Sequence, residues 1–386
     1  MHSSFSRLQL AVFALVSASF ANIYITQPVL PVLQDEFSVD LVIVSLTVSV
    51  VILGIALSTL PFGVLVDRVS IRPIIFVGGI VVALGGIICA MTGNIWLLIG
   101  ARFLQGLFLP ALTTCIAAFL AKSLPVDRLK VVMGSYVSAQ VFGGLSGRLL
   151  GGWIHPPLHW RYAFVSAAVI VLVAMFIALK NLPASPVSVR KEAGTVSFVS
   201  LMRRWELVRI YLCAAGGFFV FSSVFNYLPF RLASAPFLFS TEVVTLLYLV
   251  FILGVIMGPI AGRISNRFGS GFTLIGGGIV LVFSMVLILM PSISAVVVGL
   301  LGMCAGFFTI HTSAVGLLNS RLVSGQGCAN ALYVLFYYAG GWVGITCCGF
   351  AYKYGGWNTV VYLCCCVLLI PLSVGFGEFK RERRDN

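Results

Sequence analysis

The chain of 386 residues is 60% hydrophobic and only 9% charged, whereas soluble domains carry roughly 25% charged residues. This composition excludes an ordinary soluble domain and indicates a membrane protein. The formal net charge of +13 would suit a nucleic-acid-binding protein, but the positive residues lie mainly between apolar segments, so we do not expect nucleic acid as a partner.

Apolar segments of the length that crosses a bilayer, about 20 residues, recur along the whole chain. The first of them follows Arg7 but does not end in a small-residue cleavage site, so we interpret it as an uncleaved helix. The predicted fold class is an all-α membrane protein with twelve transmembrane helices. The predicted spans are residues 8–33, 41–63, 73–93, 95–121, 130–153, 161–182, 208–230, 241–262, 272–291, 293–318, 328–351 and 356–378.

Positive charge is distributed unequally between the two sides of this topology. Arg102 and Arg148 lie inside spans, and Arg161, Arg231 and Lys353 fall on one side. All other Lys and Arg residues fall on the side that holds both termini. The positive-inside rule therefore predicts cytoplasmic termini, and we expect a bacterial inner membrane as the location.

The sequence offers little that would suit an enzyme. The ten cysteines lie nearly all within apolar segments and have neither metal-site nor disulfide-framework spacing. No phosphate-binding loop of the type G-x-x-x-x-G-K-[ST] is present, which argues against an ATP-driven pump. We therefore predict a non-enzymatic protein that needs neither a cofactor nor a metal ion.

The two halves of the chain repeat each other at an offset of about 200 residues. The sequence FSVDLV at 37–42 recurs as FSTEVV at 239–244, and GGLSGRLLGG at 143–152 recurs as GGWVGITCCG at 340–349. Because six spans separate the copies, they predict a parallel repeat of two six-helix halves, residues 1–182 and 208–386.

A polar linker, residues 183–207, joins the two halves. At its end Phe198, Leu201, Trp205 and Val208 have the spacing of one helical face beside charged residues. This pattern predicts an amphipathic helix on the cytoplasmic surface.

The loop between spans 2 and 3 reads GVLVDRVSIR at 63–72, and GRISNR at 262–267 is its repeat. An Asp near a helix end, with Arg one and five residues later, can form charge-assisted bonds between helices. The loop resembles the G-x-L-x-D-R-x-G-R-[KR] motif of the major facilitator superfamily, from which Ser70 and Ile71 depart. The resemblance covers essentially the whole chain.

That resemblance implies a conformational latch that favours the outward-open state. A turn with ordinary cytoplasmic positive charge is the alternative interpretation. The latch residues implied are Gly63, Asp67, Arg68, Arg72, Gly262, Asn266 and Arg267.

A second motif, RFLQG at 102–106 in span 4, resembles the R-x-x-Q-G of proton-coupled members of the superfamily. Arg102, Gln105 and Gly106 share one helical face. An arginine inside a span usually faces a cavity or a partner, although Arg102 lies near enough to the outer surface to extend toward it.

Glycines in span 5 resemble a motif of the superfamily's antiporters, but Arg148 stands where that motif has proline. Its side chain has room to lie along the helix beside Gly144. Because Ile345 takes the equivalent place in the second half, packing does not require the cation, and we interpret Arg148 as a functional charge. The motif glycines are Gly134, Gly143, Gly147, Gly151 and Gly152, of which 143, 147 and 151 form a stripe for close helix packing.

No acidic residue lies in the middle of a predicted span. We therefore predict an outer charge cluster of Asp35 or Glu36 with Arg102 and Arg148, broken and remade during transport. Alternatively, the arginines attract an anionic substrate. His311 in span 10 titrates in a useful range for proton coupling, although a histidine hydrogen-bonded to a neighbour is the more common case.

We expect the substrate cavity near the membrane midplane between the halves, where Pro28, Pro31 and Pro229 break spans 1 and 7. The candidate lining residues mix aromatic and amide groups, which suit amphiphilic molecules better than sugars, although helix packing would explain any one of them equally well. They are Asn22, Tyr24, Gln27, Gln140, Phe225, Asn226, Tyr227, His311, Tyr337 and Tyr338.

These features predict a transporter that exports a small organic or amphiphilic compound by alternating access in exchange for protons. An importer or exchanger of a small organic anion is one alternative. A non-transporting receptor or assembly protein on the same fold is another. The expected partners are a small-molecule substrate, protons and the lipid bilayer, and we expect a monomer.

Overall fold

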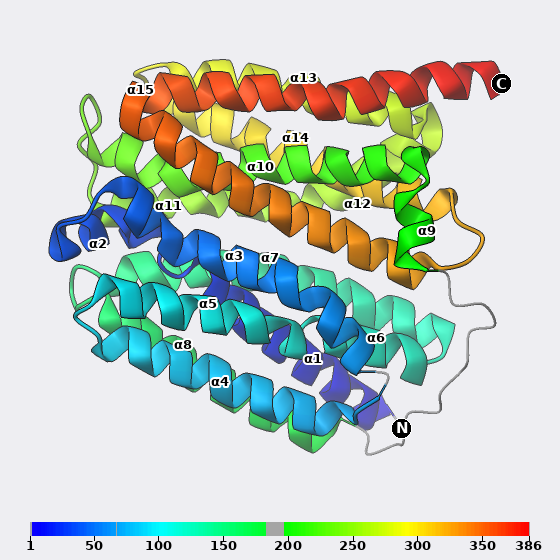
Figure 1. Cartoon of the computed structure of the whole chain (residues 1–386), viewed down its shortest axis with the longest axis horizontal. Helices are drawn as coiled ribbons and strands as arrows, with labels where there is room; N and C mark the ends of the chain where they lie inside the picture. Colours follow the sequence, from blue (N-terminus) through cyan, green and yellow to red (C-terminus); the bar gives the residue numbers. More distant parts are fainter. Residues whose placement is uncertain (1, 67, 183–196, 386) are drawn as a thin grey trace. The chain divides into compact units, whose positions relative to one another are not determined.

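Helices make up nearly all of the computed structural model, which describes residues 2–66, 68–182 and 197–385 (Figure 1). No strand occurs among these residues, in agreement with the predicted all-α class. The chain divides into two compact units. Unit 1 is Met1–Glu192 with Ser240–Tyr248, and unit 2 is Ala193–Phe239 with Leu249–Asn386.

Unit 1 combines the helices of the first part of the chain with one short helix from the second part. In chain order these elements are α1 (His2–Tyr24), η1 (Gln27–Val29), α2 (Leu30–Phe37), α3 (Leu41–Leu65), α4 (Ile71–Met91), α5 (Ile95–Leu112), α6 (Thr114–Ser123), α7 (Val126–Ile154), α8 (Arg161–Asn181) and α11 (Thr241–Leu247).

Unit 2 contains the remaining helices. They are α9 (Phe198–Met202), α10 (Trp205–Ala233), α12 (Ile252–Phe268), α13 (Ser270–Leu289), α14 (Ile293–Ser320) and α15 (Gln326–Asp385). The 3-10 turn η2 (Tyr248–Phe251) connects α11 to α12, so the boundary between the units falls inside predicted span 8.

Ten helical segments within the described ranges are long and apolar enough to cross a membrane, which agrees with a multi-pass membrane protein. Most of α15 (Gln326–Arg384) counts as one segment of 59 residues, although Gly356 with φ of 67° interrupts its helical backbone. α7 is not among the ten, because Gln140 and Arg148 interrupt its apolar stretch.

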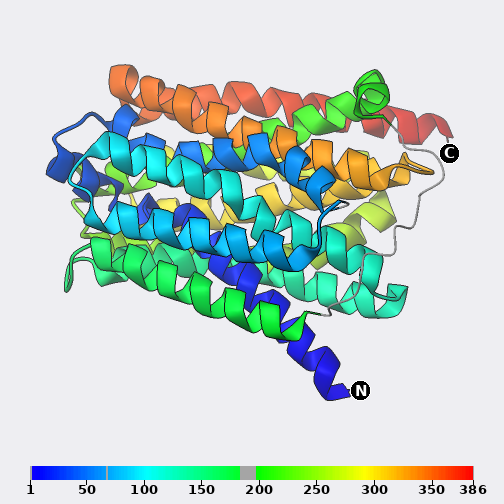
Figure 2. The same ribbon diagram turned by 60° about the horizontal axis from the view of Figure 1, so that its bottom comes forward.

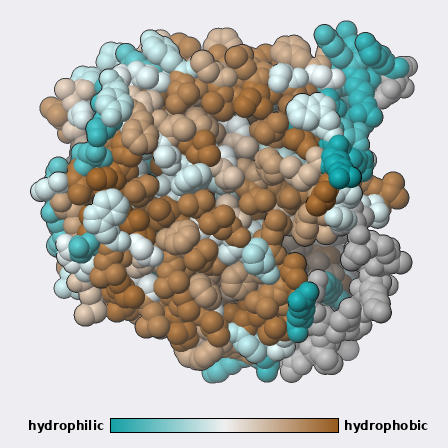
Figure 3. Space-filling view, viewed as in Figure 1, coloured by the Kyte–Doolittle hydropathy of each residue, from teal (hydrophilic) through white to brown (hydrophobic). Residues whose placement is uncertain are grey.

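α8 shows how a span divides its surface between protein and lipid. Val165, Val169 and Val173 lie on one helical face and are exposed, whereas Ala167 and Ala174 on the opposite face are buried. α8 packs beside α4 (Figure 2). Because so large an apolar face would be costly in water, it faces the bilayer. Figure 3 shows similar apolar surface over the helices, with hydrophilic residues near α9 and the end of α15.

Glycines let α7 approach the backbone of α1. A Cβ atom added to each would collide with α1, or with the residue just after it, at steps of four residues: Gly143 with Ser17, Gly147 with Ala21, and Gly151 with Ile25. This is the close packing that the glycine spacing predicts. The other two motif glycines differ, because a Cβ at Gly134 would meet no atom within 4 Å and one at Gly152 would meet Thr245 of α11.

The second half repeats this packing. In unit 2, α15 lies beside α10 (Figure 1). A Cβ added at Gly340 would collide with the backbone of Ala215, and one at Gly344 would collide with that of Phe219. The internal repeat of the sequence is therefore also a repeat of helix packing.

Proline interrupts the first span but not the seventh, so the prediction for span 7 was wrong. α1 ends at Tyr24, because Pro28 has no N–H to bond the Tyr24 carbonyl. α10 continues through Pro229. The Leu-Pro pair at 30–31 recurs at 228–229. This alignment places Asn226 where the first half has Pro28, and asparagine keeps the backbone donor.

The prediction of one amphipathic helix at the end of the linker was wrong, because two helices share these residues. α9 ends at Met202 and α10 begins at Trp205, because Arg204 takes an extended backbone conformation with φ of −86° and ψ of 98°. Leu201 is buried whereas Trp205 is exposed. Linker residues 183–196 lie outside the described residues.

We expect Gly147→Ala to lower the free energy of unfolding by about 2 kcal/mol, since the new methyl group must displace the backbone of α1. Gly134→Ala in the same helix is the matched control, because its methyl group meets open space and alanine favours a helix. Thermal unfolding of the two variants in detergent measures the difference. Equal stability of both variants would contradict the close packing of α7 on α1.

Candidate functional site

Arg102 of α5 is completely buried in unit 1 and caps the broken helix α1. Its Nη1 and Nη2 atoms donate to the carbonyl oxygens of Asn22 (2.7 Å) and Ile23 (2.8 Å), and its Nε donates to the Thr47 carbonyl of α3 (2.9 Å). The last carbonyls of a helix lack donors within the helix. The guanidinium supplies them here and does not extend to the outer surface.

Gln105 and Gly106 extend these contacts to the neighbouring helices. Gln105 Oε1 accepts from Arg102 Nη1 (2.7 Å), and its Nε2 donates to the Val82 carbonyl of α4 (2.8 Å). A Cβ atom at Gly106 would collide with the backbone of Val51 in α3. The R-x-x-Q-G sequence therefore joins α5 to α1, α3 and α4.

Arg148 of α7 contacts the same break in span 1. Its Nε donates to Gln27 Oε1 (2.6 Å) and its Nη1 to the Gly144 carbonyl (2.7 Å). Its Cζ lies 3.9 Å from the ring centroid of Tyr24 and 5.4 Å from that of Tyr248. The residue is 3% exposed, so the cation is held in a polar and aromatic environment inside unit 1.

Two buried polar atoms near the break have no hydrogen-bond partner in the described part of the chain. They are Oδ1 of Asn22 and Oγ1 of Thr26, one helical turn apart in the sequence. Buried polar atoms in folded proteins nearly always have a partner, which is often a water molecule. The break in span 1 therefore contains two buried polar oxygens that no group of the described protein satisfies.

The predicted outer charge cluster is not formed in this structure. Glu36 Oε1 accepts from Arg161 Nη1 (2.6 Å), and Oε2 accepts from Trp160 Nε1. Arg161 also donates through Nη2 to the Thr92 carbonyl (2.9 Å). Glu36 follows span 1 and meets the start of α8, whereas Arg102 is directed to the carbonyls of α1. For Asp35, the structure shows that its backbone carbonyl accepts from Ser38 N (3.3 Å).

Two histidines lie in the loop between α7 and α8, which sequence analysis did not consider. His159 Nε2 lies 3.6 Å from a Glu36 carboxylate oxygen. Partial burial and the neighbouring His159 lower the pKa of His155, so His155 is neutral at neutral pH.

Unit 2 also contains a buried carboxylate that the sequence pattern did not indicate. Glu378 of α15 is fully buried and binds Arg209 of α10 and, at 2.5 Å from Arg321 Nη2, the end of α14. Its position as the last residue of predicted span 12 gave no local signal of burial, because the burial depends on how α10 and α14 pack around α15.

The first copy of the predicted latch is described in part. Arg72 Nη2 donates to the Leu182 carbonyl at the end of α8 (2.9 Å), and Arg68 is exposed. Asp67 lies outside the described residues. A Cβ atom at Gly63 would meet no atom within 4 Å, so packing does not explain this glycine.

The second copy of the loop is mostly exposed. Asn266 and Arg267 are exposed, and Arg267 Cζ lies 5.1 Å from the ring centroid of Phe268. A Cβ atom at Gly262 would also meet open space. The role of both loops as a latch stays a prediction.

His311 of α14 lies among aromatic side chains of unit 2. Its Nδ1 is 3.0 Å from the Tyr333 hydroxyl, and its ring lies nearly parallel to Phe307, with centroids 5.9 Å apart. The Tyr337 ring is 5.2 Å away and stacks at 3.8 Å on Phe218. The hydrogen-bonded arrangement that sequence analysis gave as the common case is therefore present.

The remaining predicted cavity residues pack largely within their own units. Phe225, Asn226 and Tyr227 of α10 are fully buried, and Tyr338 of α15 is nearly so, whereas Gln140 is half-buried. Among the described residues, no group of acidic, His or Cys side chains is suited to hold a metal ion. The cavity between the two halves stays a prediction.

A helical membrane protein with repeated halves and buried arginines at a broken span has the architecture of a transporter. The model of the Major Facilitator Superfamily matches residues 12–345. The chain belongs to this superfamily.

Curated relatives resemble the chain over almost its whole length. The inner membrane transport protein YnfM of Escherichia coli is 29% identical over 98% of this chain and 91% of its own, and the uncharacterized MFS-type transporter YybF of Bacillus subtilis is 26% identical over 95% and 92%. Homologues of the chain are thus named as transporters.

Solved structures show the same fold at low identity. A bacterial homologue of the human lysosomal transporter Spinster, inward-facing and unoccupied, superposes with a TM-score of 0.78 at 14% identity, covering 99% of this chain and 98% of its own. The human organic anion transporter MFSD10 gives a TM-score of 0.73 at 17% identity, over 96% and 99%.

We expect Arg102→Lys to lower the free energy of unfolding by about 2–4 kcal/mol, since one ammonium cannot replace the guanidinium fork and buried carbonyls lose their donor. Arg161→Lys is the control, because a partly exposed lysine can still pair with Glu36 at a cost below about 1 kcal/mol. Chemical unfolding followed by helix content measures both. A stable Arg102→Lys variant would show that the capping bonds contribute little.

Proposed function

We propose that the protein is a secondary transporter that exports a small amphiphilic organic compound by alternating access, in exchange for protons. We further propose twelve spans in two six-helix halves, residues 1–182 and 208–386, and a monomer with both termini in the cytoplasm. The similarity to an inner membrane transport protein of E. coli supports a bacterial inner membrane as the location.

The observation that carries this proposal is the break in span 1, where Arg148 binds the side chain of Gln27. Transporters often form substrate sites at interrupted helices, whose backbone and side-chain polar groups are then available to the ligand. Arg148 Nε donates to the neutral amide oxygen of Gln27, an acceptor that a carboxylate or carbonyl oxygen of a substrate can replace. Tyr24 supplies an aromatic face to the same cation.

The second half supports a functional role for this charge. Ile345 stands in place of Arg148 in the repeat and is buried, although the surrounding glycine packing is the same. Close packing of these helices therefore does not need a cation. The buried Asn22 and Thr26 oxygens near the break offer further contacts for the polar end of a substrate.

His311 is the proposed proton-binding group of unit 2. Imidazole is the side chain that titrates nearest neutral pH, and the Tyr333 hydroxyl fixes the orientation of this ring. Glu378, the buried carboxylate, is bound by two arginines, and its charge is needed to balance theirs. His311 is thus better suited than Glu378 to exchange a proton.

Import or exchange of a small organic anion is the second candidate function. The same Arg148 cation favours it, and one of the proteins with a similar fold is named as an organic anion transporter. Direction of transport and proton coupling distinguish this function from export by antiport.

We expect substrate-triggered proton movement when the full-length protein is reconstituted in liposomes that hold a pH-sensitive dye. Amphiphiles with one tail and an anionic, cationic or neutral head are tested as substrates. Arg148→Ile should reduce transport at least about tenfold, the effect of losing one charged hydrogen bond. His311→Gln should abolish proton movement. Arg263→Ala, at an exposed arginine of α12, is the control and should match the wild type.

Other results would contradict the antiport proposal in different ways. Anion movement without proton flux would support the second candidate. Ligand binding to the purified protein without exchange across the liposome membrane would support a receptor or assembly protein.

A further inference from the structure

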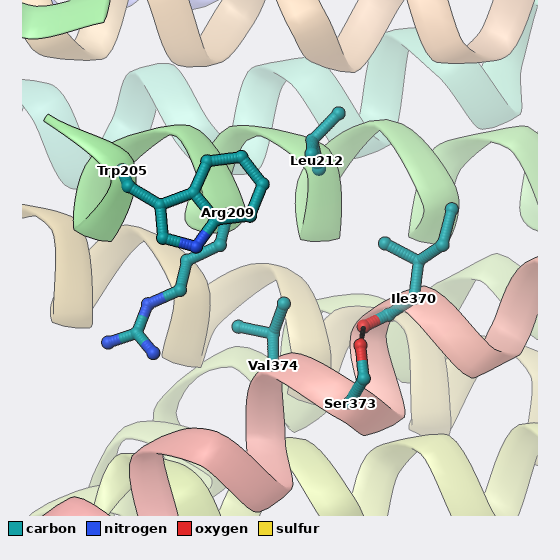
Figure 4. A pocket seen from close by; sticks show the side chains of 6 residues that line it. All are labelled: Trp205, Arg209, Leu212, Ile370, Ser373 and Val374. Atoms are coloured by element: carbon teal, nitrogen blue, oxygen red, sulfur yellow. Dashed lines mark hydrogen bonds between the residues drawn. The ribbon is translucent and has the colours of Figure 1, made fainter. Parts of the chain in front are cut away.

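A groove on unit 2 lies between the first turns of α10 and the later part of α15 (Figure 4). Its volume is about 370 Å³. The proposed transport function does not involve this groove. Its lining residues are Trp205, Arg209 and Leu212 of α10 and Ile370, Ser373 and Val374 of α15.

One end of the groove is positively charged. Arg209 reaches from α10 toward α15, where its Nη2 binds Glu378. A Cβ atom at Gly377 would lie 3.4 Å from Arg209 Nη1, so the absence of a side chain there leaves room beside the guanidinium. Its buried Nε has no hydrogen-bond partner among the residues that the structure describes.

The ion pairs around Arg209 leave an excess of positive charge. Glu378 binds two arginines, and Glu206 binds two others. Four arginines against two glutamates give a formal excess of two positive charges in this network. The arginines are Arg204, Arg209, Arg321 and Arg381.

The other end of the groove is apolar and faces outward. Leu212 lies about 10 Å further along α10 than Trp205, and Ile370 on α15 is 38% exposed. Trp205 itself is 69% exposed, and tryptophan is enriched at the level of lipid headgroups. The groove therefore leads from a basic, interfacial end to an apolar one.

We infer that this groove binds an anionic phospholipid, with its phosphate beside Arg209 and an acyl chain along Leu212 and Ile370. Basic pockets between transmembrane helices bind anionic headgroups in this manner. Assignment to the cytoplasmic leaflet rests on the proposed orientation, because Arg203, Arg204 and the basic end of α15 lie at the same end of unit 2. Binding itself does not depend on the transported substrate.

Native mass spectrometry of the purified full-length protein tests this inference. The protein is titrated with phosphatidylglycerol, with phosphatidylcholine of the same acyl chains, and with inorganic phosphate. We expect the wild type to retain phosphatidylglycerol about fivefold more tightly than phosphatidylcholine, the effect of one basic residue near a headgroup. Arg209→Ala should remove this preference, whereas Arg263→Ala should keep it.

A second variant separates lipid binding from folding. Ser373 is exposed on the groove wall, so Ser373→Trp fills the groove without disturbing the Glu378 ion pairs and should reduce retention of both lipids. Unchanged selectivity in Arg209→Ala, or unchanged retention in Ser373→Trp, would overturn the inference. Equal binding of free phosphate and phosphatidylglycerol would also overturn it, because the apolar end would then play no part.

Discussion

Pro28 removes one backbone donor from span 1 and breaks the helix there. The packing of unit 1 depends on which groups bond the carbonyl oxygens at this break. Carbonyl oxygens at the end of α1 have no donor within the helix and no water in the membrane interior. Arg102 supplies the donors from α5, and Gln105 links the arginine to α4. The donors that the carbonyl oxygens of Asn22 and Ile23 lack at the end of α1 thus explain why a permanent cation lies buried in span 4.

The corresponding helix of the second half, α10, is not broken at the equivalent place. α10 remains helical where α1 is broken, because Asn226 keeps the donor that Pro28 lacks. Leu300 of α14 corresponds to Arg102, since each lies seven residues after the start of its helix, and Leu300 is apolar and fully buried. Ile345 likewise replaces Arg148. Both buried arginines of unit 1 therefore occur with the break, one as a cap and one as a charge beside it.

Sequence patterns predicted the parts of the fold that depend on local chemistry. Glycine spacing predicted that α7 packs closely against a neighbouring helix, and Pro28 predicted the break in span 1, since both effects arise from the local sequence. The partners of Arg102 and the burial of Glu378 depend on helices distant in the sequence, so no local pattern indicated them. The 3-10 turn in span 8 contains no proline or glycine, and the ion pair of Glu36 with Arg161 joins residues distant in the sequence.

The central claim is that Arg148 beside the break binds the negatively charged or polarised end of the substrate. Ligand-induced changes in the unfolding temperature of the purified protein test it most directly, because a ligand stabilises the state that it binds. We expect an amphiphilic carboxylate to raise this temperature in the wild type but not in Arg148→Ile. Equal stabilisation by an amphiphilic ammonium with the same tail, or a carboxylate effect that persists in Arg148→Ile, would contradict the claim.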